Sequence, residues 1–203
     1  MSRVGSAGGW RRPAAATAGE GPRPRILFVV RTLNPGGAEG QLALLAAGLR
    51  RRGHPVAVLA LYPGGALEPG LRAAGVQVDT PRKAGRWDVL GFSRRIAALA
   101  RAYRPDLVHG YMDAGNLAAL AVKAAWPRAA LVWGERMSAI DLARYERFVR
   151  AAHRAVSLLA RAPDLVIANS VAGAAFARAR GVPAARVRVV PNGIDTERFR
   201  PCR

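Results

Sequence analysis

The stretch Val187-Arg188-Val189-Val190-Pro191-Asn192-Gly193-Ile194-Asp195 combines a short β-branched strand with a turn. Proline fixes φ and removes a backbone donor, and Asn-Gly accepts positive φ, so the backbone is expected to leave a sheet at Asn192. The chain continues from there only to Arg203. We therefore expect residues 191–203 to form a hinge, with Pro191, Asn192 and Gly193 at its turn, that leads into a further lobe.

Upstream of this turn, short apolar runs alternate with longer segments of helical period. This alternation is typical of a parallel sheet with crossover helices. It predicts an α/β fold over residues 25–190, a doubly wound, mostly parallel Rossmann-like sheet with helices on both faces. The predicted strands are Ile26–Val30, Val56–Leu61, Val76–Asp79, Leu107–His109, Ala130–Trp133, Leu165–Ala168 and Val187–Val190. The predicted helices are Glu39–Arg51, Leu67–Ala74, Val89–Ala102, Ala114–Ala125, Ser138–Ala160 and Val171–Arg180.

The ends of the chain and its cysteine content indicate a compartment. Residues 1–24 lack the apolar core of about 7–15 residues that a signal peptide needs, so we expect a disordered basic leader. No run of about 18 apolar residues occurs, so no membrane-spanning helix is predicted. Cys202 is the only cysteine, which excludes a disulfide framework and favours a reducing compartment. We expect a cytoplasmic protein, free or peripheral at the inner membrane face.

The chain is strongly basic, with 32 Lys and Arg against 13 Asp and Glu and a formal net charge of +19. Lys83 and Lys123 are the only lysines, and the arginines are spread through every predicted helix. A nucleic-acid-binding protein clusters its arginines and interleaves aromatic residues, so no nucleic-acid partner is expected. The scatter favours a compositional bias of the coding sequence. Attraction to an anionic membrane surface or to phosphate-bearing substrates is the alternative.

The predicted helix Ser138–Ala160 is amphipathic. Ser138 and Asp141 at its start resemble a capping box, with aspartate in place of the usual Glu or Gln. A crossover helix must cover the sheet, so packing is favoured over an orientation flat on a membrane. Its apolar face consists of Leu142, Tyr145, Val149, Ala152, Val156 and Leu159.

The loop after the first predicted strand, Arg31-Thr32-Leu33-Asn34-Pro35-Gly36-Gly37-Ala38-Glu39, is the first candidate for a ligand site. Ligands of open α/β sheets bind beyond the carboxyl ends of the strands. Paired glycines let the backbone approach a ligand, and the following helix start favours an anion such as a diphosphate. A tight strand-to-helix turn is the alternative. G-x-G-x-x-G is absent and Leu61-Tyr62 offers no carboxylate for a ribose, which disfavours a nicotinamide-dependent dehydrogenase.

Five segments, in order along the chain, resemble the landmarks of the amino-terminal lobe of family 4 glycosyltransferases, which have the two-lobed GT-B fold. The resemblance implies transfer of a sugar from a nucleotide-sugar donor to a glycan or lipid-linked acceptor, with retention at the anomeric carbon. It implies no cofactor and no metal ion, and it points to members that build polysaccharide or O-antigen. The segments are Gly36–Glu39, Leu49–Val56, Pro105–His109, Ala162–Ser170 and Val190–Asp195.

The resemblance also implies roles for single residues. Gly36 and Gly37 would face the donor diphosphate and stabilise charge on the leaving nucleotide. His109 would lie close to the sugar as a candidate catalytic residue, but the family often shows His-x-His where this chain has Tyr111, and a structural histidine is the alternative. Arg136 would grip a phosphate or a sugar hydroxyl, with a solvated surface arginine as the alternative.

Further candidates for substrate or acceptor binding have structural alternatives. Glu39 alternatively favours the helix dipole, and Ser170 alternatively caps a helix, as do two polar residues that open the helix after the fourth strand. His54 and His153 match no site residue of the family and are expected to be structural or on the surface. The full set of these binding candidates is Arg31, Glu39, Tyr111, Asp113, Asn116 and Ser170.

The donor side of the expected site is missing from the sequence. The family binds nucleotide and sugar mainly through a carboxyl-terminal lobe, which commonly carries two glutamates eight positions apart. No pair of glutamates in this chain has that spacing. We expect the chain alone to be inactive, because proximity and exclusion of water need both lobes. The alternatives are a non-catalytic acceptor-binding or partner lobe for a separate donor lobe, and a basic nucleic-acid-binding α/β protein.

Overall fold

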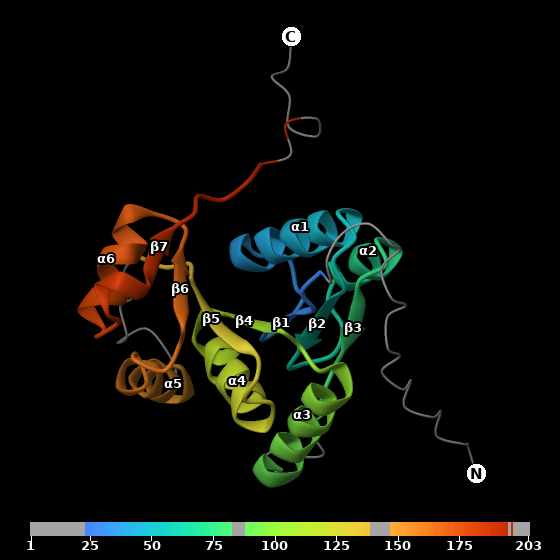
Figure 1. Cartoon of the computed structure of the whole chain (residues 1–203), viewed down its shortest axis with the longest axis horizontal. Coiled ribbons are helices and arrows are strands. Elements are labelled where there is room, and N and C mark those ends of the chain that lie inside the picture. Colours follow the sequence, from blue (N-terminus) through green and yellow to red (C-terminus); the bar gives the residue numbers. More distant parts are fainter. Residues whose placement is uncertain (1–22, 83–87, 139–146, 195, 197–203) are drawn as a thin grey trace.

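The computed structural model describes residues 23–82, 88–138, 147–194 and 196. Within these ranges the strands form one seven-stranded sheet in the order β3-β2-β1-β4-β5-β6-β7 (Figure 1). Every neighbouring pair of strands is parallel. The predicted α/β class and the doubly wound Rossmann-like sheet are confirmed.

The elements follow the predicted alternation. The strands are β1 (Ile26–Val30), β2 (Val56–Ala60), β3 (Gln77–Asp79), β4 (Leu107–Tyr111), β5 (Ala130–Glu135), β6 (Leu165–Ala168) and β7 (Val187–Val189). The helices are α1 (Gly37–Arg51), α2 (Glu68–Ala73), α3 (Val89–Tyr103), α4 (Met112–Ala125), α5 (Arg147–Leu158) and α6 (Val171–Ala179). A short 3-10 helix, Ala184–Arg186, precedes β7.

Some predicted segments lie outside the described residues. These are residues 1–22 of the expected leader, the part of the predicted helix Ser138–Ala160 that spans residues 139–146, and residues 195 and 197–203 of the expected hinge. The proposed capping box of Ser138 falls there as well, because it depends on Asp141.

The sheet carries a core on each face, because side chains alternate along each buried strand. Phe28 and Val30 of β1 belong to the cluster that includes Leu42 of α1, whereas Leu27 and Val29 belong to the cluster of α3 to α6. In Figure 1, α1 and α2 lie on one side of the sheet, and α3, α4 and α5 lie on the other. The two faces are therefore covered by separate sets of helices.

Two strands extend beyond their predicted ends. The prediction that the fourth strand ends at His109 is wrong, because Gly110 and Tyr111 continue the ladder and pair with β5. Likewise β5 passes Trp133 and ends at Glu135, which pairs with β6. Glycine, tyrosine and glutamate interrupt the apolar runs there, so the hydrophobic pattern stops before the backbone pairing does.

The helix after β4 begins without a loop. The sequence predicted its start at Ala114, but α4 begins at Met112, which has a positive φ of 60°. A non-glycine residue in that region is strained and needs surrounding structure to hold it. This sharp junction places Tyr111 and Asp113, which are two residues apart, in different parts of the molecule.

Candidate functional site

A groove of about 590 Å³ runs along the sheet face beside α1. On its sheet side it is lined by His109 and Tyr111 of β4, Arg136 after β5 and Ile167 of β6. The helix side and the far wall consist of Gln41, Leu44, Leu45, Gly48, Leu49, Arg51 and Arg52 of α1 and its end, and of Val190, Pro191, Asn192 and Gly193. The groove thus brings together three candidates predicted from the sequence and the expected hinge.

Arg136 is the charged centre of this groove. Its guanidinium carbon lies 4.7 Å from the centroid of the Tyr111 ring, and Nη2 donates to Tyr111 Oη at 3.0 Å. Nη1 donates to Asn192 Oδ1 at 3.2 Å, whereas Nε is buried without a hydrogen-bond partner. Arg136 is therefore a fixed cation at the groove and not a freely solvated arginine.

His109 lies beneath Arg136 and is only 5% exposed. Its ring packs against both Phe28 and Tyr111, at centroid distances of 5.5 and 4.7 Å. Burial, and then the positive charge of Arg136, lower the pKa of His109 to about 3. The imidazole is therefore neutral near pH 7 and can offer one donor or one acceptor, but no charge, to a ligand. Its Nε2 is buried without a partner.

The paired glycines lie at the start of α1, outside the residues that line the groove. Gly36 is the N-cap, and its carbonyl accepts from the Gly40 amide at 2.8 Å. A β-carbon added to Gly37 would meet no atom within 4 Å, whereas one added to Gly36 would overlap the Glu39 carboxylate. Glu39 therefore turns back onto the loop, where its charge favours the helix dipole. The open side of the loop is at Gly37.

Arg31 follows β1 directly, and its side chain contacts Tyr62 in the loop after β2. Its guanidinium carbon is 5.9 Å from the centroid of the exposed Tyr62 ring. The Tyr62 amide donates to the Arg31 carbonyl at 3.0 Å, which continues the contact between these two chain segments beyond the paired strands. Arg31 and Tyr62 thus form a small basic and aromatic surface beside the Gly36-Gly37 loop.

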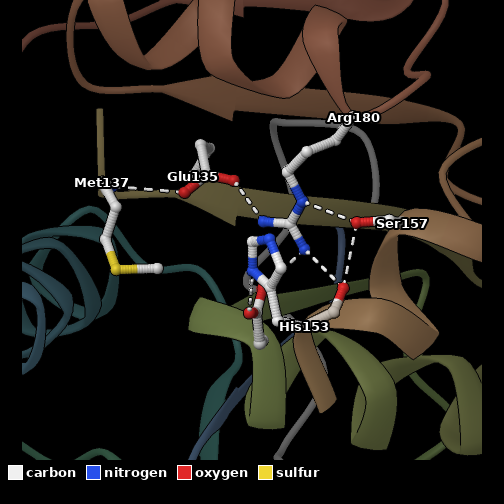
Figure 2. A network of polar contacts seen from close by, with 6 residues as sticks. Glu135, Met137, His153, Ser157 and Arg180 are labelled. Carbon is white, nitrogen blue, oxygen red and sulfur yellow. Dashed lines mark hydrogen bonds and ion pairs between the residues drawn. The ribbon is translucent and has the colours of Figure 1, made fainter. Parts of the chain in front are cut away.

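Asp113 and Asn116 lie inside the core that α3 to α6 cover, and neither lines the groove. Asp113 accepts from Arg180 Nη2 at 2.9 Å, and its other oxygen lies 3.1 Å from His153 Nδ1. Glu135 Oε2 accepts from Arg180 Nη1 at 3.2 Å (Figure 2). Two carboxylates therefore share one guanidinium, and this network joins α4, β5, α5 and the end of α6. Its side chains bind one another in the interior of the lobe.

Glu135, a member of this network, has a shifted pKa. Burial raises its pKa to about 7, although Arg180 and the Met137 amide oppose that shift and Asp113 adds to it. The Met137 amide donates to the other carboxylate oxygen at 3.2 Å. Glu135 therefore exchanges its proton in the physiological range while remaining within the core.

Ser170 caps α6. Its hydroxyl accepts from the Gly173 amide at 3.0 Å, which confirms the N-cap interpretation of this residue.

The segment after β7 is held by side chains of the lobe. Gln41 of α1 donates through Nε2 to the Gly193 carbonyl at 2.8 Å, and its Oε1 accepts from the Gly193 amide at 3.0 Å. Neither Asn192 nor Gly193 adopts the positive φ that Asn-Gly can accept. The side chain of Gln41 pairs with both backbone groups of Gly193. Nothing in the sequence distinguished Gln41 from an ordinary surface residue.

In the described part of the chain, no cluster of three or more His, Cys, Asp and Glu side chains could hold a metal ion. None of the helices in residues 23–82, 88–138 and 147–194 is long and apolar enough to cross a membrane.

The comparison with protein families gives one match, Glycosyltransferase Family 4, over residues 35–198. The chain belongs to this family. No curated protein sequence matches it significantly. The matched region contains the groove, the start of α1 and the segment after β7.

Solved structures agree with this assignment. HepE from Anabaena, in complex with UDP and glucose, has 25% sequence identity and a TM-score of 0.67 over 86% of this chain. The sucrose-phosphate synthase of Thermosynechococcus elongatus, at 14% identity and a TM-score of 0.64 over 88% of this chain, shares the fold. So does the lipopolysaccharide outer core galactosyltransferase WaaB, at 12% identity and a TM-score of 0.62 over 84% of this chain.

The chain spans about half of each of these proteins, at 46%, 50% and 46% of their lengths. It therefore corresponds to a single Rossmann-like lobe of the two-lobed GT-B architecture.

Proposed function

We propose that this chain is the acceptor-side lobe of a retaining glycosyltransferase, which transfers a sugar from a nucleotide-sugar to a glycan or lipid-linked acceptor. One observation carries the proposal. Helix α1 borders the groove that holds Arg136 and His109, and the same helix begins at the open Gly37 loop. HepE, a relative at 26% identity, was solved with UDP-glucose, which supports a nucleotide-sugar donor.

The proposed roles follow from charge and access. Cleavage of the bond between sugar and diphosphate leaves negative charge on the nucleotide. The amino end of α1 and the unhindered Gly37 backbone favour that charge, because the helix dipole and free amide groups point toward an approaching anion. Arg136 adds a fixed positive charge, and neutral His109 offers a hydrogen bond to a sugar hydroxyl. No metal ion has a part in this scheme.

The proposal includes a second lobe. The sugar and the nucleotide base would be held chiefly by that lobe, and closure of the two lobes would bring donor and acceptor together at the reacting atoms. This chain alone is proposed to be inactive. The net charge of +19 is consistent with work at an anionic membrane surface, where lipid-linked acceptors lie.

A domain-joining experiment tests the function. The whole chain is assayed alone and joined to the half of HepE that it does not cover, with UDP-glucose as donor and water as acceptor. We expect no glucose release from the chain alone and release from the joined protein. The first anomer seen by proton NMR should be α, as in the donor. HepE cut and rejoined at the same point is the control.

Three results would overturn parts of the proposal. Glucose release by the chain alone would remove the need for a second lobe. A β anomer as the first product would exclude retention. An inactive joined protein, beside an active rejoined HepE control, would argue against a transferase role for this lobe.

A further inference from the structure

We propose that Arg136 couples the binding of a phosphate-type oxyanion in the groove to release of the segment Pro191–Ile194. The inference rests on the proposed function only in taking this groove as a ligand site. It assigns to Arg136 a positioning role toward the hinge that no feature of the sequence suggested.

The segment after β7 leaves the sheet at a defined point. The Val190 amide donates to the Ala168 carbonyl at 2.9 Å, one residue beyond the end of β7. Farther along, two side chains from the body of the lobe hold it, since Arg136 binds the Asn192 side chain and Gln41 binds the Gly193 backbone. The path of this segment therefore depends on side chains that also line the groove.

Two buried nitrogens near these contacts have no hydrogen-bond partner. They are Nε of Arg136 and Nε2 of His109. A β-carbon built on Gly134 would lie 3.0 Å from the Gly110 carbonyl oxygen, 3.2 Å from His109 Nε2 and 3.6 Å from Arg136 Nε, so both nitrogens lie beside this glycine. Buried polar atoms without partners cost free energy, which favours a shift of Arg136 toward a ligand oxygen in the groove.

An oxyanion would compete with Asn192 for Arg136. The existing bond from Nη1 goes to a neutral amide oxygen, is 3.2 Å long and is exposed. A guanidinium pairs with phosphate through two parallel, charge-assisted hydrogen bonds, each about twice as strong as a bond between neutral groups. Arg51 and Arg52, which also line the groove, would add attraction for the anion. Arg136 would therefore turn toward the ligand and release Asn192.

Binding of an oxyanion in the groove would therefore weaken the contacts that hold the segment Pro191–Ile194. With Arg136 engaged by an oxyanion, Gln41 alone would hold Gly193, and the segment would open more often. Because such coupling is reciprocal, weakening the contact between Arg136 and Asn192 must strengthen oxyanion binding by the same factor. If oxyanion binding and release of the segment were independent, weakening the Asn192 contact would leave the oxyanion affinity unchanged.

Amide hydrogen exchange of the whole ¹⁵N-labelled chain tests the coupling, with pyrophosphate as the probe. Saturating pyrophosphate should speed exchange of the Gly193 amide about fivefold, since one hydrogen bond that holds the segment is lost. Asn192→Ala should speed it by a similar factor without the probe and should bind pyrophosphate about fivefold more tightly. Arg136→Gln should bind the probe weakly and show no further change in exchange on its addition.

Arg188→Gln is the matched control, because Arg188 also lies near the hinge but donates to the carbonyls of Ala185 and Val187 and does not line the groove. It should respond to pyrophosphate like the unmodified chain. Pyrophosphate binding at Arg136 without faster exchange at Gly193, or unchanged affinity in Asn192→Ala, would overturn the proposal. No sugar transfer is measured, so these results do not depend on the joined-protein assay.

Discussion

At Gly37, the effect of a substitution on ligand binding can be separated from its effect on folding. A β-carbon there meets nothing within 4 Å, and the residue is already helical, so Gly37→Ala should change the free energy of unfolding by less than about 1 kcal/mol. The added methyl group would nevertheless block a phosphate from the backbone. We expect about tenfold weaker binding of UDP-glucose by calorimetry, with an unchanged urea midpoint.

Gly40→Ala controls for this change, because Gly40 lies one turn later on α1 and its β-carbon would also meet no atom within 4 Å. It should leave UDP-glucose binding unaltered. Equal binding by the Gly37→Ala and Gly40→Ala variants would assign the paired glycines to the turn alone, which is the structural alternative.

Glu135 makes stability depend on pH. Its pKa is raised from 4.5 to about 7, mainly by burial, so the folded state holds this proton where the unfolded state has lost it. Stability contributed by the protonated carboxyl is complete below pH 4.5 and is lost as the pH rises to about 7. The expected loss is on the order of 2 kcal/mol. His109, whose pKa is lowered to about 3, acts in the opposite direction, because its unfolded form gains a proton as the pH falls below 6.5. The Glu135 contribution is therefore measured by urea unfolding at pH 5 and at pH 7.5 as the difference between the unmodified chain and Glu135→Gln.

Glu135→Gln keeps the shape of the side chain and removes the titration. Arg180, Asp113 and His153 form the rest of the network, and they remain in this variant. From pH 5 to pH 7.5 the unmodified chain should therefore lose about 2 kcal/mol more stability than the variant. Equal changes in the two proteins would mean that another group carries the pH dependence assigned to Glu135.

At the scale of elements, glycines determine how closely α4 approaches the sheet. A β-carbon on Gly115 would lie 2.5 Å from the Val29 carbonyl oxygen, and one on Gly110 would lie 2.7 Å from the Asn116 α-carbon. Both neighbours are backbone atoms of the core and cannot move away easily. Gly115→Ala should therefore destabilise the lobe by about 1–3 kcal/mol, the usual cost of overpacking.

Thermal unfolding checks this prediction, with Gly70→Ala as the control. Gly70 lies in α2, and its β-carbon would meet no atom within 4 Å. The control should unfold at the same temperature as the unmodified chain or slightly above it, because alanine favours helix. A Gly115→Ala variant as stable as the control would mean that α4 can shift on the sheet.

The elements themselves could largely be predicted from the sequence. Leu165–Ala168 is a strand with the predicted bounds, and Gly53, Gly75 and Gly181, which follow helices, have the positive φ that glycine readily accepts. These features depend on local chemistry, which a sequence displays directly. The ends of β4 and β5 could not be predicted, since there the pairing with neighbouring strands determines the backbone.

The site was predicted less completely, because the sharp junction at Met112, which has a positive φ, sends neighbouring residues to different parts of the lobe. Tyr111 and Asp113 both follow the apolar part of β4, yet one lines the groove and the other joins a buried network with His153. His153 is 40 residues from Asp113, and Gln41 is 152 residues from Gly193. Contacts over such separations depend on the fold, and single residues give no sign of them.

For the whole molecule, the two faces of the sheet differ in how they are covered. The core clusters place α3 to α6 on one face, whereas α1 and α2 pack against β1 to β3 and Tyr111 on the other. The groove lies on this second face, between α1 and the segment that leaves β7. Under the proposed function, a second lobe would contact this face, with the groove, the Gly37 loop and the segment after β7 at the junction between the lobes.

Chemical-shift mapping of UDP-glucose on the whole ¹⁵N-labelled chain tests the proposal that this lobe presents a nucleotide-sugar site at the carboxyl ends of its strands. We predict weak binding, with amide shifts concentrated at Gly36 and Gly37 and at Arg136, and no release of glucose. Shifts concentrated at the opposite ends of the strands would contradict the proposal, as would the absence of shifts at these residues at a hundred times the UDP-glucose concentration that saturates HepE.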